Sequence, residues 1–374
     1  MKQLRYLIVV IAAASAVTLL LVPSAHQPVS AANLQISPAQ FASYIRQWSE
    51  PEGYFDSDNF ITNETSYEHV TDELHSRVRP GGVYLGVGPD QNFTYIAQTR
   101  PALAVIIDIR RQNMLQHLLY KALFEQAESR AEFLALWFAK ETPVVRKGAS
   151  LPEVLKAVRA APSSEPTFKR DSDRVKTILS KRYDLGLSEE DFRKIEYTYG
   201  TFWRDNLDLR FSSIGRNNAM QYPTLEDILV ETDRHGQMQN FLASDELFDW
   251  MKKFETENRL IPVVGDFGGN HAFRAVAKFL KDNGLQVSTF YTSNVEFYLF
   301  GSPAWSAFMS NVHALPLNAD SVFIRSYFGS YGRILSQTVP GHRSTSLVHG
   351  IVPFLNDYDA GKIPSYWEVV NRSK

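Results

Sequence analysis

Two short, continuous apolar runs flank a helical pattern in the first third of the chain. Val83–Val87 and Leu103–Ile107 are rich in β-branched residues, and glycines bound the first run. Runs of this kind are typical of parallel strands that helices cover on both faces. Between them, Gln91–Thr99 has the length and pattern of a crossover helix. The pattern therefore predicts a strand, a turn, a helix and a second strand.

The same alternation returns towards the C-terminus. Leu260–Asp266 and Gln286–Tyr291 have the pattern of strands, and an amphipathic helix is predicted between them over His271–Asn283. A last β-rich run covers Val322–Tyr327. Strands that alternate with helices indicate a parallel sheet covered on both faces. We therefore predict an α/β fold with a doubly wound, mostly parallel Rossmann-like sheet and a largely helical insertion.

The insertion is predicted in the middle of the chain, where helix starts replace strands. Serine followed by acidic residues begins helical patterns, for example at Ser150 and Ser244, as at a helix N-cap. We predict a mostly helical insertion or cap over 141–257, and the pattern leaves open whether it is a domain or a lid. N-terminal helices and the first half of the Rossmann-like domain occupy 32–140, and the second half occupies 258–374.

Helices are also predicted on both sides of the first strand pair. Ser37 as N-cap and Gln40 three residues later have the pattern of a capping box, with a helix that runs to Trp48. A second helix is predicted over 66–77, and 110–140 is long enough for two helices.

The N-terminus has the layout of a secretory signal. Basic residues precede an apolar run over 6–22, and small residues follow near Ala31. We predict a signal peptide over 1–31, with cleavage after Ala31 or, as the second choice, after Ala32. The alternative is an uncleaved membrane anchor formed by 6–22. Both interpretations predict an exported domain, periplasmic or secreted, whose sole contact with a membrane would be an uncleaved N-terminal segment.

Composition removes several classes of function. Thirty-nine basic against 41 acidic residues leave a formal net charge of −2, so no positive field attracts nucleic acid. The chain has no cysteine, which excludes thiolate chemistry and zinc–thiolate sites. Its nine histidines form no metal-binding motif, and neither a P-loop nor a nucleophile elbow is present. We therefore predict no metal and no nucleic-acid partner.

The strongest candidate for chemistry is the turn Gly86–Asn92 that joins the first strand to its helix. Gly86 and Gly88 would allow the unusual backbone angles of such a turn and the close approach of a ligand. Asp108, twenty residues after Gly88, ends the next strand, where an acid binds ribose hydroxyls. Asp90 at the helix start would repel a pyrophosphate and favours a cationic ligand. The alternative is a plain tight turn.

Residues of this turn and of the next strand resemble a known family. Gly82–Asp90 resembles the first motif of class I S-adenosylmethionine-dependent methyltransferases, and Val105–Asp108 resembles the second. Longer strings also resemble an uncharacterised bacterial family of methyltransferase-like proteins. They are Asn59–Thr65, Gly82–Ala97, Asp108–Phe124, Val263–Gly269 and Phe290–Phe300.

The resemblance implies a cofactor, S-adenosylmethionine, and roles for the residues of the turn. Gly86, Gly88 and Asp90 would line its methionine portion, and Asp108 would bind its ribose. We also expect Gln91 and Asn92, at the start of the helix, to contact the cofactor. Pro89 departs from the family pattern because a small residue is common there.

Further candidates lie in loops that could border the same pocket. Asn63 and Glu64 precede the helix predicted over 66–77, where they would fold over a ligand or cap the helix. Tyr291 and Asn294 follow a predicted strand, at the edge of the sheet where open α/β sheets bind ligands. The alternative for these is a set of buried, hydrogen-bonded polar side chains.

Two carboxylates are the candidate catalytic groups. Asp266 ends a predicted strand, and Glu296 follows another. Either would orient or deprotonate a methyl acceptor that lies in line with the sulfonium.

These observations predict an exported methyltransferase-like protein that binds S-adenosylmethionine or a related nucleoside, with methylation of a small molecule as its reaction. The alternative is a non-catalytic exported binding or interaction protein on the same scaffold, because fold does not fix function. A nicotinamide-dependent oxidoreductase ranks third, since the third glycine of the dinucleotide fingerprint is missing. The sequence identifies neither the methyl acceptor nor the oligomeric state.

Overall fold

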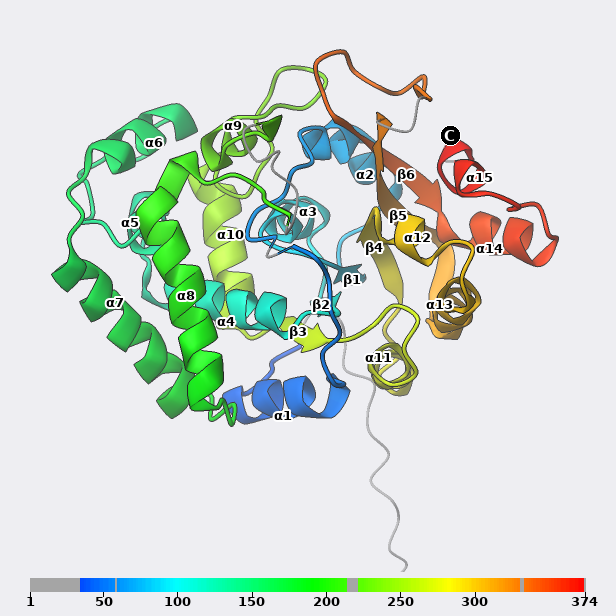
Figure 1. The fold of residues 1–374 in the computed structure, drawn as a ribbon, viewed down its shortest axis with the longest axis horizontal. Coiled ribbons are helices and arrows are strands. Elements are labelled where there is room, and N and C mark those ends of the chain that lie inside the picture. Colours follow the sequence, from blue (N-terminus) through cyan, green and yellow to red (C-terminus); the bar gives the residue numbers. More distant parts are fainter. Residues whose placement is uncertain (1–33, 58, 214–220, 330–332, 373–374) are drawn as a thin grey trace, which may run out of the picture.

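The computed structural model describes residues 34–57, 59–213, 221–329 and 333–372. The predicted signal peptide or anchor lies outside these ranges. The described chain forms one sheet with helices on both faces (Figure 1).

Six strands make up the sheet, in the order β3-β2-β1-β4-β5-β6. Their bounds are Val83–Gly86 (β1), Leu103–Asp108 (β2), Leu260–Val264 (β3), Val287–Ser293 (β4), Leu317–Phe328 (β5) and Ser344–Gly350 (β6). The pairs from β3 to β5 are parallel, and β6 runs antiparallel to β5. This is the strand order of a Rossmann-like sheet. The chain first adds β2 and β3 on one side of β1 and then returns to add β4 on its other side. The predicted mostly parallel, Rossmann-like α/β fold is confirmed.

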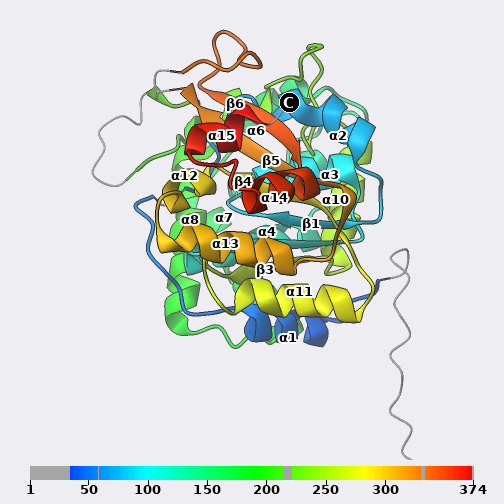
Figure 2. The same ribbon diagram turned by 90° about the vertical axis from the view of Figure 1, so that its right-hand side faces the viewer.

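Helices form a layer on each face of the sheet (Figures 1 and 2). One layer contains α3 (Gln91–Thr99), α4 (Arg111–Gln126) and α10 (Asp245–Thr256), which pack on one another in pairs. The other contains α11 (Ala272–Asp282), α13 (Pro303–Ala314) and α14 (Ile351–Asp359). At the β3 edge, α1 (Pro38–Trp48) packs on β3 and α11. The remaining helices are α2 (Thr71–Arg77), α5 (Arg130–Trp137), α6 (Leu151–Ala160), α7 (Glu165–Thr177), α8 (Glu189–Asp205), α9 (Leu225–Leu229), α12 (Val295–Leu299) and α15 (Tyr366–Asn371).

The two strands recognised first in the sequence are buried along their whole length. Every residue of β1 and β2 is buried, which explains why both read as continuous apolar runs. The capping box predicted for α1 is present, since the Ser37 side chain accepts from the Gln40 backbone and the Gln40 side chain accepts from Ser37. Strand and helix bounds in this half lie within three residues of the pattern, apart from α2. A 3₁₀ turn over Tyr67–Val70 precedes that helix, which begins at Thr71.

The helical segment between β2 and β3 shares its core with the sheet. Its helices α5 to α10 follow α4 in the chain, and both α8 and α10 pack on α4. Tyr199 and Phe202 of α8 belong to the same buried apolar cluster as Leu115 of α4 and Val105 of β2. The described part of 141–257 therefore extends the layer on one face of the sheet, with many of its apolar side chains in the common core.

Candidate functional site

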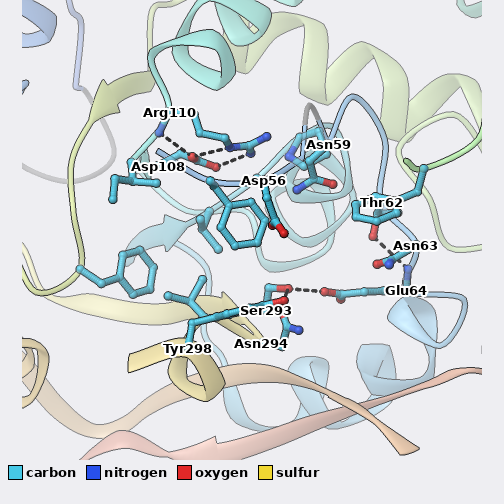
Figure 3. A pocket seen from close by; sticks show the side chains of 18 of the residues that line it. Asp56, Asn59, Thr62, Asn63, Glu64, Asp108, Arg110, Ser293, Asn294 and Tyr298 are labelled. Atoms are coloured by element: carbon cyan, nitrogen blue, oxygen red, sulfur yellow. Dashed lines mark hydrogen bonds and ion pairs between the residues drawn. The ribbon is translucent and has the colours of Figure 1, made fainter. Parts of the chain in front are cut away.

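A cavity of about 400 Å³ opens at the carboxyl ends of the parallel strands. Residues at the ends of β1, β2, β3 and β4 line it, together with described residues of the loop over 54–64 and with Phe211, Ser213 and Tyr222. The cavity therefore spans the position between β1 and β4, where open α/β sheets bind ligands. Its volume lies in the usual range for small-molecule sites. Figure 3 shows side chains from these loops around one space.

Seven of the residues singled out in the sequence line this cavity. They are Asn63, Glu64, Gly88, Asp108, Asp266, Tyr291 and Asn294. Five others, each with another local role described below, are outside the lining. They are Gly86, Asp90, Gln91, Asn92 and Glu296.

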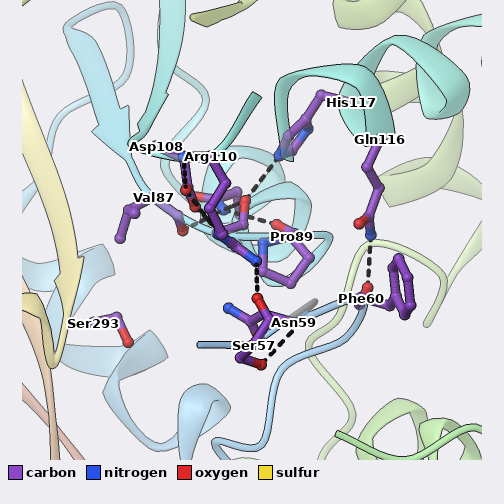
Figure 4. A network of polar contacts seen from close by, with 12 residues as sticks. Ser57, Asn59, Phe60, Val87, Pro89, Asp108, Arg110, Gln116, His117 and Ser293 are labelled. Carbon is purple, nitrogen blue, oxygen red and sulfur yellow. Dashed lines mark hydrogen bonds and ion pairs between the residues drawn. The ribbon is translucent and has the colours of Figure 1, made fainter. Parts of the chain in front are cut away.

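Gly88 presents backbone to the cavity. Its φ is +80°, a conformation that costs a residue with a Cβ extra free energy. A Cβ added at this position would meet nothing closer than the Asn59 side chain, at 3.9 Å. Its carbonyl oxygen accepts a hydrogen bond of 2.8 Å from Nε2 of His117 on α4, as Figure 4 shows. Gly88 therefore combines a fixed backbone with open space for a ligand.

Gly86 and Asn92 hold the backbone of the turn in place. The Asn92 side-chain amide donates to the carbonyl oxygens of Val87, Gly88 and Pro89, at 2.9, 3.1 and 2.7 Å. A Cβ on Gly86 would overlap the Asn92 side chain. Both residues therefore hold the turn from outside the cavity lining, and the cofactor contacts expected of them stay predictions.

Asp90 and Gln91 also face away from the cavity. Asp90 is 3% exposed, and burial raises the pKa of its carboxyl group to about 7. Its Oδ1 atom has no hydrogen-bond partner among the described residues. Gln91 donates from Nε2 to Glu64 and to the hydroxyl of Tyr95, at 2.8 and 3.1 Å. Both side chains are buried and lie outside the cavity lining, so the ligand contacts expected of them stay predictions.

Asp108 lines the cavity with its carboxylate already bound by Arg110. Oδ1 accepts from the backbone N and from Nε of Arg110, at 2.9 and 3.0 Å, and Oδ2 accepts from Nη2 at 2.7 Å. Both side chains are buried, at 4% and 9% exposure. Nη1 of Arg110 also donates to the Ser57 carbonyl at 3.2 Å (Figure 4). A carboxylate accepts up to about four hydrogen bonds, so Oδ2 retains capacity for a ligand hydroxyl.

Glu64 forms the floor of the cavity and connects three elements. Its oxygens accept from Gln91 of α3 at 2.8 Å, from the hydroxyl of Tyr291 on β4 at 2.9 Å, and from Ser293 and Ser326. Glu64 is 2% exposed and forms no ion pair with a described residue. A buried carboxyl group without a cation is costly unless hydrogen bonds satisfy it, so this network fixes the position of the side chain.

Asp266 lies at the end of the cavity next to β3. Its Oδ1 atom accepts from the backbone N of Gly268 at 2.9 Å. Its own backbone N donates to Glu50 at 2.6 Å. Asp266 is half-buried and lines the cavity. It is the predicted catalytic carboxylate whose position agrees with contact to a ligand.

Glu296 lies outside the cavity lining, in an ion pair with Arg325. Arg325 of β5 donates to both of its oxygens, from Nε at 2.6 Å and from Nη2 at 2.9 Å. Both side chains are buried, at 1% and 2% exposure. The catalytic role expected for Glu296 does not agree with this position, because its carboxylate is enclosed in an ion pair and lies outside the cavity lining.

The sequence did not single out several residues that line the cavity. Asp56, Asn59 and Arg110 contribute polar groups, and Tyr54 and Tyr298 contribute rings. Three of them come from the loop over 54–64, where the sequence predicts neither a helix nor a strand. Its density of aromatic and polar residues was the available signal, because loops held by a rigid scaffold are enriched in binding residues.

The cavity has a negative lining. Among the described lining residues, Asp56, Glu64, Asp108 and Asp266 carry carboxylates, and Arg110 is the one basic residue. Since Arg110 is paired with Asp108, three carboxylates remain without a described cationic partner. Their field favours a ligand with positive charge.

Neither a metal-binding group nor a membrane-spanning helix is found among the described residues. No group of three or more His, Asp or Glu side chains in them is placed to hold a metal ion. No helix in these ranges is long and apolar enough to cross a membrane.

One family model matches the chain. It is described as a domain of unknown function (DUF7790) and matches residues 59–360. No curated protein sequence matches the chain. The family match covers the whole sheet and every lining residue from Asn59 onwards.

Proposed function

The chain belongs to the DUF7790 family, a family of unknown function, and from that premise we propose that its cavity binds S-adenosylmethionine or a related nucleoside. The observation that carries the proposal is that Gly88 and Asp108 line one cavity. They follow adjacent parallel strands, which pair from Val83 with Leu103 to Gly86 with Ile106. In this arrangement the glycine admits the ligand close to the backbone and the acid accepts from a ribose hydroxyl.

Charge supports this cofactor over a nicotinamide dinucleotide. S-adenosylmethionine carries a positive sulfonium and an ammonium group, whereas a dinucleotide carries a negative pyrophosphate. Three lining carboxylates, Asp56, Glu64 and Asp266, have no cationic partner among the described residues. Such a lining attracts the first ligand and repels the second.

Methyl transfer to a small molecule is the reaction that we propose for the bound cofactor. The acceptor atom would attack the methyl carbon while the carbon–sulfur bond breaks towards sulfur, and the proton of the acceptor would pass to a carboxylate or to water. Asp266 would orient the acceptor or take its proton, since Oδ1 accepts one backbone hydrogen bond and the group faces the cavity. The protein contributes mainly position and electrostatics to such a step.

A second candidate is a binding protein on the same scaffold without catalysis. The observation that favours it is the enclosure of Glu296 by Arg325, which leaves Asp266 as the remaining predicted acid near a ligand. The export predicted from the N-terminus also favours it, because S-adenosylmethionine is a ligand of the cell interior.

Calorimetric titration of the mature chain tests the proposal. S-adenosylmethionine and its demethylated product should bind, and NAD⁺ should bind more weakly or not at all. No heat of binding with either nucleoside at millimolar concentration would rule out the proposal. Asp266→Asn should weaken binding of the cationic cofactor, whereas Asp320→Asn, at an exposed aspartate of β5 outside the cavity, serves as the matched control.

A second measurement separates the two candidates. Methyl-labelled cofactor is incubated with the protein and a small-molecule extract of its host, and labelled products are counted. Transfer that Asp266→Asn reduces supports the enzyme. Tight cofactor binding without any transfer supports the binding protein.

A further inference from the structure

The mouth of the cavity is the part lined by Tyr54, Phe55, Asp56 and Tyr298, and three of these side chains are aromatic. Phe55 of the 54–64 loop and Tyr298 of α12 meet edge to face, with ring centroids 5.3 Å apart and an angle of 87° between the rings. Tyr298 is 49% exposed and Tyr54 is 77% exposed. Further rings in the lining come from Phe211, Tyr222, Phe267, Tyr291 and Phe328. Exposed apolar side chains that gather beside one cavity indicate a binding surface, whereas single exposed ones need no explanation.

A carboxylate stands next to these rings. Asp56 directly follows Phe55 in the chain, and Figure 3 shows its side chain projecting into the cavity, between Asp108 and Ser293 in that view. Asp56 forms no ion pair with a described residue. Asp266 adds a second carboxylate from the β3 side. The mouth therefore combines electron-rich ring faces with unneutralised negative charge.

We propose that this mouth binds a small organic cation, with a quaternary ammonium, a protonated amine or a sulfonium as the recognised group. Phe55 and Tyr298 would contact the cation through their rings, and Asp56 would neutralise it. Aromatic rings attract such cations through their quadrupole, most strongly where water is excluded. A nearby carboxylate strengthens that attraction in the low dielectric of a cavity.

Other ligand classes fit the mouth less well. An inorganic cation needs several oxygen ligands at short range, and no group of three or more His, Asp or Glu side chains among the described residues is placed to supply them. A neutral aromatic ligand would stack on the rings but leave the carboxylates unpaired. The described chain already uses ring–cation contacts, since the guanidinium of Arg343 lies 5.3 Å from the ring centroid of Tyr222, a lining residue.

This inference deepens the proposed function and rests on it in one respect, that the same cavity is the ligand site. It does not require a nucleoside. The sulfonium of the cofactor and the amine of a second ligand share the recognised chemistry, so the experiment must separate these two sources of positive charge.

Choline and its neutral isostere 3,3-dimethylbutan-1-ol are the probes, because they differ chiefly in charge. Binding to the mature chain is measured by calorimetry and by tyrosine and tryptophan fluorescence. We expect choline to bind at least about tenfold more tightly, which corresponds to roughly 1.4 kcal/mol and lies within the range of a ring–cation contact. Equal affinity for the two probes, or no choline binding, would overturn the inference.

Variants locate the site. Tyr298→Leu and Asp56→Asn should each weaken choline binding by about fivefold or more. Tyr197→Leu is the matched control, since Tyr197 is also exposed, at 55%, and lies outside the cavity lining. Unchanged choline affinity in both site variants would place the ligand elsewhere and overturn the inference.

Parallel titrations with S-adenosylmethionine and its neutral thioether product assign the source of the cation. A preference for the sulfonium that Tyr298→Leu removes shows that the mouth recognises the cofactor itself. Choline binding without nucleoside binding would support this inference while the proposed function fails. Equal affinity for the cofactor and its thioether product, without choline binding, would support the proposed function and overturn this inference.

Discussion

Arg110 binds the carboxylate of Asp108 through two side-chain hydrogen bonds, from Nε at 3.0 Å and from Nη2 at 2.7 Å. The two residues are separated in the chain by Ile109 alone, so the pair closes a short loop at the end of β2. The guanidinium fixes the carboxylate in one orientation and neutralises its charge. A ribose hydroxyl would therefore meet a preoriented acceptor in a part of the cavity without net charge.

Asp108→Asn tests the contribution of this pair. The substitution keeps the size of the side chain but leaves the buried guanidinium of Arg110 without its counter-ion. We expect the free energy of unfolding, measured by denaturant titration, to fall by about 3 kcal/mol, as for other broken buried pairs. Asp282→Asn, in an exposed pair with Lys278, should have no measurable effect. Equal stability of wild type and Asp108→Asn would contradict this account of the pair.

Gly88→Ala tests whether the left-handed backbone of the turn serves a ligand. Gly341 is the matched control, because its φ is +93° and a Cβ there would meet nothing within 4 Å, much as a Cβ on Gly88 would meet only the Asn59 side chain at 3.9 Å. Each substitution should lower the free energy of unfolding by about 1–2 kcal/mol through backbone strain. Nucleoside binding should be lost in Gly88→Ala and retained in Gly341→Ala. If both variants bind the nucleoside as the wild type does, the turn is not a ligand site.

The fold was predictable where a single physical pattern dominates. Strands β1 and β2 are buried on both faces, so their sequences are continuously apolar and their bounds are easily located. Strand β6 was not predicted, because its sequence Ser344–Gly350 is mostly polar and its pairing with β5 depends on contacts far away in the chain. β5 begins at Leu317, five residues before the predicted run, since the polar residues Asn318, Asp320 and Ser321 interrupt the apolar pattern there.

The site was predictable where the backbone determines it. Gly88 and Asp108 have fixed positions relative to two strands, so strand prediction places them in the cavity. Glu296 and Asp90 have the same residue type as true lining residues, and only their partners distinguish them. Arg325, which encloses Glu296, lies 29 positions away in the chain. Such long-range pairing has no local signal, and neither has the approach of the 54–64 loop to α12.

A buried ion cluster joins α4 to α10 and can be tested by a double substitution. Nζ of Lys121 donates to the Glu255 carbonyl at 2.6 Å and lies 3.9 Å from the Glu255 carboxylate. Burial lowers the pKa of Lys121 and raises the pKa of Glu255. Lys121→Met leaves the carboxylate without its nearest cation, and we expect a loss of about 3 kcal/mol in unfolding free energy.

Adding Glu255→Leu to Lys121→Met should restore much of that loss, because both buried charges are then gone. Chemical denaturation of the wild type, the single variant and the double variant gives the comparison. A double variant that is less stable than Lys121→Met would show that the carboxylate is stabilising in its own right, contrary to this interpretation.

His117 makes the turn at Gly88 sensitive to acid. Burial lowers the pKa of its ring to about 4, from the usual 6.5, while Nε2 donates to the Gly88 carbonyl. The unfolded chain therefore binds a proton between about pH 6.5 and 4 that the folded chain does not. The stabilisation is complete above pH 6.5 and is lost as the pH falls towards 4, with a slope of up to about 1.4 kcal/mol per pH unit.

His117→Gln isolates this contribution, since an amide can still donate to the Gly88 carbonyl but does not titrate. His69 and His349 also have pKa values lowered by burial, and both remain in the variant, so the informative quantity is the difference between the two proteins. Denaturant unfolding at pH 7, 6, 5 and 4.5 should show a shallower loss of stability in His117→Gln. Parallel pH profiles would mean that His117 accepts its proton without opening the turn, because the ring could then be charged in place.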